Sequence, residues 1–201
     1  MRHPLGVTSS SSTPIILLIG YPGTGKYTVG KALVEQLQST GATALLVDNH
    51  FINNPIFRLI EVDGRSPLPA EMWDRVGEFR ETLLKTIESL APRDRAFVFT
   101  NWIAEDESGA AEYLARLEAI AQARQSRFAV VRLVCELQTL KERVPRADRA
   151  ERLKWTDPDA VAALASRHRL YDPTVPSLTI DNTELSADAC ARQILSYAAA
   201  G

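Results

Sequence analysis

The sequence predicts an α/β fold, in which a parallel sheet carries helices on both faces. Apolar runs of strand length alternate with segments of helical periodicity along most of the chain, and parallel sheets are built from such alternation. The first apolar run opens directly into a glycine-rich turn and a helix. The chain has 201 residues, of which 45% are hydrophobic, so it is long enough for one well-packed domain.

The glycine-rich turn carries the most specific signal in the chain. Residues 15–19 form the first predicted strand, and the turn that follows reads GYPGTGK, which fits the pattern G-x-x-x-x-G-K of a phosphate-binding loop. Glycines let such a loop bring backbone N–H groups close to phosphate oxygens, and the next helix points its positive end at them. Lys26 supplies a mobile charge for the β- and γ-phosphates. The predicted nucleotide-binding residues here are Gly20, Tyr21, Pro22, Gly23, Thr24, Gly25, Lys26, Tyr27 and Thr28.

One residue departs from this pattern. The position after the lysine is normally Ser or Thr, whose hydroxyl holds Mg²⁺, but here it is Tyr27, followed by Thr28. We therefore expect Mg²⁺ to be held largely by water, by the triphosphate and by a carboxylate elsewhere in the chain.

The remaining elements are predicted from periodicity and turn residues. The first helix is expected to end near residue 38, and a second strand, 43–47, leads to Asp48. Residues 49–69 are expected to be a long irregular loop, because they contain Asn-Asn-Pro, Asp-Gly and two further prolines. Further helices are predicted over 69–90, 109–125, 137–144, 157–171 and 186–199, and further strands over 96–99, 128–135 and 178–180. Residues 1–14 are expected to be a flexible tail, and residues 15–201 a single domain with a lid at about 144–156.

The ends of the strands predict the reaction site, because ligands of open parallel sheets bind beyond the carboxyl ends of the strands. Asp48 is the candidate general base for a substrate hydroxyl, or a ligand of Mg²⁺. The alternative is an aspartate that caps a helix or begins a turn. His50 is a candidate substrate contact, although a lone histidine in a loop is usually only a polar residue.

Four arginines follow the fourth predicted strand at intervals of three residues: Arg143, Arg146, Arg149 and Arg152. Such a series suits a lid that closes over developing negative charge, with Arg146 and Arg149 as the candidate catalytic arginines. The alternative is a solvated surface on which these arginines pair with neighbouring carboxylates.

Composition limits the possible partners. The net charge of −2 does not favour nucleic acid or an anionic membrane, and no apolar run approaches the ~20 residues that cross a bilayer. The two cysteines, Cys135 and Cys190, form no disulfide framework. We expect a cytoplasmic protein, either a monomer or a homodimer, that acts on a small molecule.

Four segments carry a resemblance to a known group: GYPGTGKYTVGKAL, LLVDNHFI, RLVCELQTLKERV and SLTIDNTELSADACARQIL. They resemble the nucleoside-monophosphate-kinase-like branch of the P-loop proteins, to which shikimate kinase, chloramphenicol phosphotransferase and zeta-toxin-like kinases belong. The resemblance implies a P-loop three-layer sandwich with strand order 2-3-1-4-5 and a short lid between strands four and five.

The resemblance also implies individual roles. Asp48 matches the base of chloramphenicol-phosphotransferase-like enzymes, Arg143 the arginine that packs on adenine, and Asn182 the turn that lines the base pocket. His50 stands where shikimate kinases have a second aspartate, so the pattern does not extend to shikimate. The acceptor site is expected instead on 50–69 and the end of strand three, with His50, Arg58, Arg65 and Asn101.

These features together predict an ATP-dependent kinase for a small hydroxylated acceptor, with Mg²⁺. Two alternatives remain open at this point. A P-loop nucleoside triphosphatase that acts as a switch or motor lacks a recognisable water-positioning motif here. A nucleotide-binding protein without catalysis is favoured by Tyr27 alone.

Overall fold

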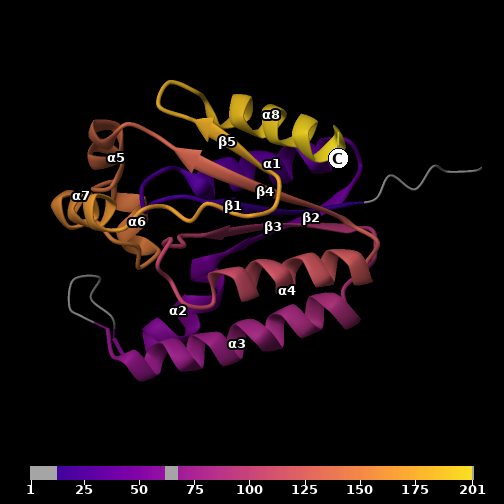
Figure 1. The fold of residues 1–201 in the computed structure, drawn as a ribbon, viewed down its shortest axis with the longest axis horizontal. Coiled ribbons are helices and arrows are strands. Elements are labelled where there is room, and N and C mark those ends of the chain that lie inside the picture. The colour runs from indigo at the N-terminus through magenta and orange to yellow at the C-terminus, as the bar shows by residue number, and fades with distance from the viewer. Residues whose placement is uncertain (1–12, 62–67, 201) are drawn as a thin grey trace, which may run out of the picture.

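The computed structural model describes residues 13–61 and 68–200. Its centre is a five-stranded sheet in the order β2-β3-β1-β4-β5, with all neighbouring strands parallel (Figure 1). This confirms the predicted fold class and strand order. The strands are β1 (Pro14–Ile19), β2 (Thr43–Asp48), β3 (Arg95–Asn101), β4 (Arg127–Val134) and β5 (Ser177–Asp181).

The strand β1 lies in the middle of the sheet because it is apolar on both faces. Residues 15–19 are all 0% exposed, and side chains of successive residues point to opposite sides of the sheet. Burial of each large aliphatic side chain contributes about 1.5–3 kcal/mol. This strand therefore fixes the position of the loop that follows it.

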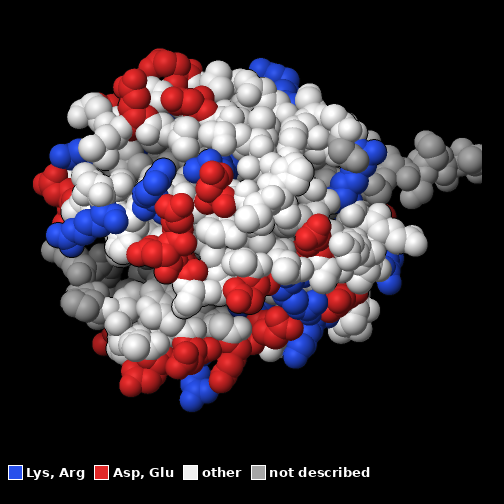
Figure 2. All heavy atoms as spheres, in the orientation of Figure 1, with Lys and Arg blue, Asp and Glu red and all other residues white. Residues whose placement is uncertain are grey.

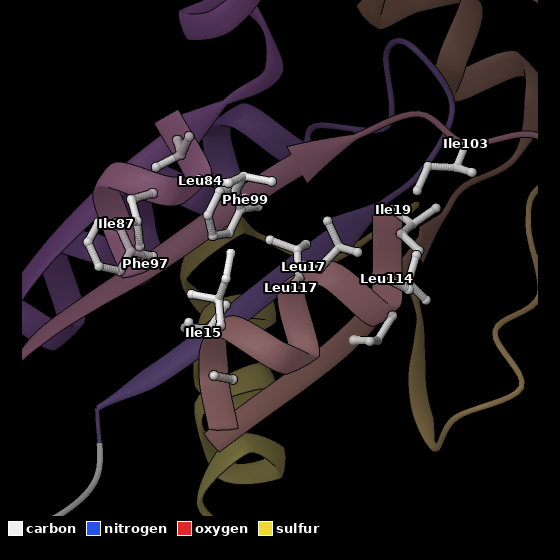
Figure 3. Close-up of a cluster of buried hydrophobic side chains, with 14 of the residues drawn as sticks. Ile15, Leu17, Ile19, Leu84, Ile87, Phe97, Phe99, Ile103, Leu114 and Leu117 are labelled. Atoms are coloured by element: carbon white, nitrogen blue, oxygen red, sulfur yellow. The ribbon is translucent and has the colours of Figure 1, made fainter. Parts of the chain in front are cut away.

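Two layers of helices cover the sheet (Figure 1). The helices α1 (Lys26–Ser39) and α8 (Ala187–Ala200) pack on one face, over Ile16 and Leu18. The helices α3 (Ala70–Ser89) and α4 (Ala110–Ala123) cover the other face. There Ile15, Leu17 and Ile19 meet side chains of α3, α4 and β3 in one apolar cluster (Figure 3).

The expectation of an irregular loop over 49–69 was wrong for its first half. Residues Asn49–Leu59 form helix α2, with Pro55 inside it. Asp48 caps its start by accepting from the backbone N–H of His50 at 3.4 Å. Ile52 and Phe57 are buried against the rest of the protein, and this burial outweighs the cost of a proline within a helix.

The carboxyl end of the sheet is covered by three short helices, α5 (Leu137–Arg143), α6 (Ala147–Glu151) and α7 (Pro158–Arg167). The helix α7 ends earlier than the expected residue 171. His168 has extended backbone, and Leu170 instead forms an antiparallel bridge with Ala104. Within residues 13–61 and 68–200, none of the helices combines the length and the apolar content that crossing a membrane requires.

Candidate active site

The phosphate-binding loop joins β1 to α1 in the shape that its glycines allow. Gly23 and Gly25 have φ values of +97° and +88°, and Gly25 is the N-cap of α1. The loop also packs closely on α5, because a Cβ atom on Gly23 would lie 2.8 Å from Cγ2 of Val144. The start of α1 therefore points its backbone N–H groups towards the space beneath the lid.

Several of the residues predicted to bind the nucleotide hold the loop in shape and do not line the cavity. The Thr24 hydroxyl donates to the carbonyl of Tyr21 at 2.9 Å, and the Asn182 side-chain amide donates to the carbonyl of Thr24 at 2.7 Å. The Tyr21 hydroxyl donates to the carbonyl of His168 at 2.7 Å. These bonds join the loop to β5 and to the segment after α7, so they hold it in shape.

Lys26 lies across the loop that it follows. Its ammonium donates to the carbonyl oxygens of Gly20 and Tyr21, at 2.5 and 2.9 Å. Burial, and then repulsion from the Lys154 ammonium, lower the pKa of Lys26 to about 7. A bound phosphate would offer this ammonium a charged partner in place of two neutral carbonyls.

The loop, the helices α2 and α3 and the segment 144–156, which is the predicted lid, line an open cavity of about 700 Å³. Figure 2 shows a hollow at this end of the molecule, below the place of helices α6 and α7 in Figure 1. From the loop, the predicted residues that line it are Pro22, Gly23, Gly25, Lys26, Tyr27 and Thr28. From the rest of the chain they are His50, Asn101, Arg143, Arg146 and Arg149. One chamber therefore holds both the phosphate-binding groups and the residues expected to contact an acceptor.

Asp48 is buried at the end of β2, behind a residue of the lid. Its Oδ2 accepts from the Lys154 ammonium at 2.6 Å, and its Oδ1 accepts from the same ammonium at 3.2 Å and from the Thr100 hydroxyl at 3.1 Å. Although burial opposes ionisation, Lys154 and His50 hold the pKa of the Asp48 carboxyl below its ordinary value. Lys154 lines the cavity and Asp48 does not. Asp48 is thus both a helix cap, as the alternative expectation had it, and the partner of a lid cation.

Tyr27 meets the same part of the lid with its ring. The guanidinium of Arg152 lies 4.2 Å from the ring centroid, and the ammonium of Lys154 lies 4.7 Å from it. Both distances are those of cation–π contacts. In this protein the position after the loop lysine therefore holds cations of the lid against an aromatic face.

The other lid arginines differ in what they contact. Arg143 donates to the side chain and backbone of Asn182 and to the carbonyl of Thr183, so it is held on the turn after β5. Arg149 donates twice to the carbonyl of Trp155 within the lid. Arg146 lines the cavity and is the N-cap of α6.

His50 has a defined proton position because of its neighbour. The Asn54 amide donates from Nδ2 to the carbonyl of Arg152 at 3.2 Å, so its Oδ1 faces His50 Nδ1 at 3.0 Å. An amide oxygen only accepts, so Nδ1 carries the proton and Nε2 keeps its lone pair. Burial and Lys154 lower the pKa of His50 to about 4, so the ring is neutral at pH 7. A neutral Nε2 can accept a hydrogen bond from a hydroxyl.

The part of the cavity between α2, α3 and the end of β3 is aromatic with a few polar atoms. Phe57, Trp73 and Trp102 line it, together with Asn53. The Oδ1 of Asn53 and the Nε1 of Trp102 are buried, and neither has a hydrogen-bond partner among residues 13–61 and 68–200. Arg58, in contrast, is exposed on the last turn of α2 and does not line the cavity. Arg65 lies outside the described residues.

The donor set does not fit a protein-bound Mg²⁺. The described residues contain no group of three or more His, Cys, Asp or Glu side chains able to hold a metal. The carboxylate expected to bind the metal, Asp48, already holds the Lys154 ammonium, and Tyr27 replaces the usual hydroxyl. A role for Asp48 as metal ligand remains a prediction that would require Lys154 to leave it.

Sequence reasoning missed Lys154 and Asn54, and it offered Thr100 only as part of the end of strand three. Lys154 lies within the predicted lid, but its partner Asp48 is 106 residues away, and nothing local pairs the two. The register of the sheet pairs Thr100 with Asp48, because their Cα atoms lie opposite one another in the β2–β3 pair. Such a register is set by the fold rather than by a motif.

Solved structures share this fold at low sequence identity. The Mycobacterium tuberculosis APS kinase CysC, in complex with AMPPNP and APS, is 17% identical with a TM-score of 0.56, over 92% of this chain and 96% of that chain. A gluconokinase from Sinorhizobium meliloti 1021 is 16% identical with a TM-score of 0.57, over 94% and 93%. Chaetomium thermophilum Kti12, in complex with ADP-AlF3, is 16% identical with a TM-score of 0.57, over 92% and 96%. No protein-family model and no curated protein matches the sequence. The chain has the α/β fold of the P-loop kinases.

Proposed function

We propose that this protein is a phosphotransferase that moves the γ-phosphate of ATP to a hydroxyl of a small-molecule acceptor. The observation that carries the proposal is a cavity of about 700 Å³ whose wall combines the phosphate loop and the lid cations with a polar and aromatic part, which includes Asn53, Phe57, Trp73 and Trp102. A kinase needs room for an acceptor beside the nucleotide, and the polar and aromatic part of this cavity supplies it. The APS kinase and the gluconokinase that share the fold support the same activity class.

Each part of the site has a role in the proposed reaction. Lys26, the loop N–H groups and the lid arginines Arg146 and Arg149 bind the triphosphate and balance its charge. Mg²⁺ would enter with the triphosphate, held mainly by phosphate oxygens and water. On the acceptor side, the His50 Nε2 accepts a hydrogen bond from the reacting hydroxyl, and Asn101, at the end of β3, lines the same cavity.

The transfer requires no reactant other than ATP and the acceptor. A bond forms between the acceptor oxygen and the γ-phosphorus, the bond from that phosphorus to the β–γ bridging oxygen breaks, and ADP leaves with the electron pair. The hydroxyl proton goes to Asp48, which becomes accessible once the Lys154 ammonium turns to the phosphates. This assigns the base role to Asp48 and an orienting role to His50.

A screen of ATP consumption tests the proposal. Hydroxylated metabolites, nucleosides and hydroxylated antibiotics are incubated with Mg·ATP and the wild-type chain, the Lys26→Ala variant, and the control Lys31→Ala, whose residue is exposed on α1. We expect one acceptor class to be phosphorylated by the wild type and the control and not by Lys26→Ala. Tight ATP binding without phosphorylation of any acceptor would refute the kinase and favour a non-catalytic nucleotide-binding protein. ATP hydrolysis that a macromolecule stimulates would favour the switch.

A further inference from the structure

We propose that Lys154 is a second catalytic cation of the transfer site, carried by the lid and placed there by the ring of Tyr27. The inference rests on the proposed function and adds to it a residue and a positioning device. It also gives a physical reason for the tyrosine in a position that most phosphate loops give to Ser or Thr.

The position of Lys154 in the cavity supports this role. Its side chain is 10% exposed, lines the cavity together with Lys26, and bonds both oxygens of Asp48. An ammonium has three N–H donors, and the described hydrogen bonds of Lys154 all go to this one carboxylate. A phosphate oxygen at the loop can therefore share the ammonium with Asp48 or take it over.

The charges of Lys26 and Lys154 also support this role. After burial, repulsion from the Lys154 ammonium is the largest cause of the low pKa of Lys26, and both ammonium groups line the same cavity. Two cations in one partly buried site repel each other until an anion arrives. A triphosphate supplies that anion, and once Lys154 has turned to it the cation is in place before charge develops in the transition state.

The contacts of the Tyr27 ring account for the position of the lid cations. Its ring contacts both Arg152 and Lys154, whereas none of the hydrogen bonds in the described part of the chain uses its hydroxyl. Tyr27 is the second residue of α1, directly after Lys26, so whatever docks on its ring lies beside the phosphate site. The backbone carbonyl of Arg152 is held separately by Asn54, which brings the lid onto α2. The ring thus holds two cations of the lid by cation–π contacts, and Lys154 is the one that reaches the reaction site.

Matched variants at position 27 separate this role from that of a metal ligand. Tyr27→Phe keeps the ring and loses the hydroxyl, while Tyr27→Ser restores the usual hydroxyl and loses the ring. The experiment that compares them is hydrogen exchange of the lid amides in 147–154 with AMPPNP bound. We expect Tyr27→Ser to exchange about tenfold faster than Tyr27→Phe, as the loss of two cation–π contacts implies. Equal exchange in the two variants would overturn the docking role.

Turnover with an identified acceptor tests the catalytic role. Lys154→Met is expected to lower kcat by about 10²–10³-fold, and Lys154→Arg to recover part of the loss. Lys31→Met serves as the control with unchanged turnover. A Lys154→Met enzyme with wild-type kcat, or a Tyr27→Ser enzyme that outperforms Tyr27→Phe, would overturn the proposal. If the wild type phosphorylates no acceptor, the proposed function and the catalytic role of Lys154 fail together. The hydrogen-exchange experiment still tests whether the Tyr27 ring holds the lid.

Discussion

Replacing Asp48 with asparagine tests the centre of the proposed mechanism. The substitution keeps the size of the side chain and an oxygen for the Thr100 hydroxyl, but removes the charge that faces Lys154. A positioned general base contributes about 10²–10⁴-fold to a rate, which is about 3–5 kcal/mol of barrier. We therefore expect Asp48→Asn to lose kcat by this factor.

The same substitution has a second, opposite consequence for ATP. Asp48 is the negative charge that binds Lys154, and without it the ammonium is free to bind phosphate. ATP affinity in Asp48→Asn should therefore equal or exceed that of the wild type. Loss of one partner of a buried ion pair costs about 3–5 kcal/mol when the other charge stays buried. Here Lys154 lies on a surface lid and can turn to solvent, so we expect this cost to loosen the lid rather than to unfold the domain.

The assay combines steady-state kinetics with calorimetric titration of AMPPNP and urea denaturation. Asp106→Asn is the matched control, because Asp106 also lines the cavity but pairs with His168. Turnover of Asp48→Asn at the wild-type rate would refute the assignment of Asp48 as base. Loss of AMPPNP binding would refute the competition between Asp48 and phosphate for Lys154.

Three further predictions concern other parts of the structure. Lys26 has a pKa of about 7 in the free loop, so its charge is lost as the pH rises through 7, while bound phosphate favours the charged form. AMPPNP affinity should thus fall between about pH 6 and pH 9, with proton uptake detected by calorimetry in two buffers; a pH-independent affinity would contradict this. Gly23→Ala combines positive φ with a clash against Val144, whereas Gly41→Ala has positive φ and nothing within 4 Å. The second should lose about 1–2 kcal/mol in urea denaturation and the first more, together with ATP binding; equal losses would count against the close packing of loop and α5. Arg124 is buried and donates to four backbone carbonyls between residues 87 and 95, so Arg124→Met should cost about 2–4 kcal/mol while ATP binding remains, and an unchanged urea midpoint would contradict it.

Local patterns in the sequence predicted most of the fold. Five consecutive apolar residues, a glycine-rich turn and helical periodicity each report the conformation of their own segment, because backbone preference and burial repeat over a few residues. The segment after Asp48 shows the limit of this reasoning. Its asparagines and Pro55 are typical of a loop, but the burial of Ile52 and Phe57 makes it a helix. That burial depends on neighbours from distant parts of the chain.

Residue types along the chain were enough to predict the phosphate loop, with Lys26 at its end, and to place Asp48 at the carboxyl end of a strand. Folding brings Asp48 to Lys154, Tyr27 to two cations of the lid, and Asn54 to the ring of His50, whose proton it positions. A loop motif is a local object whose residue types follow from backbone geometry and so can be recognised along the chain. Pairing between side chains depends on distance in space and on burial, which raises the strength of each charge interaction, and both arise only when the chain has folded.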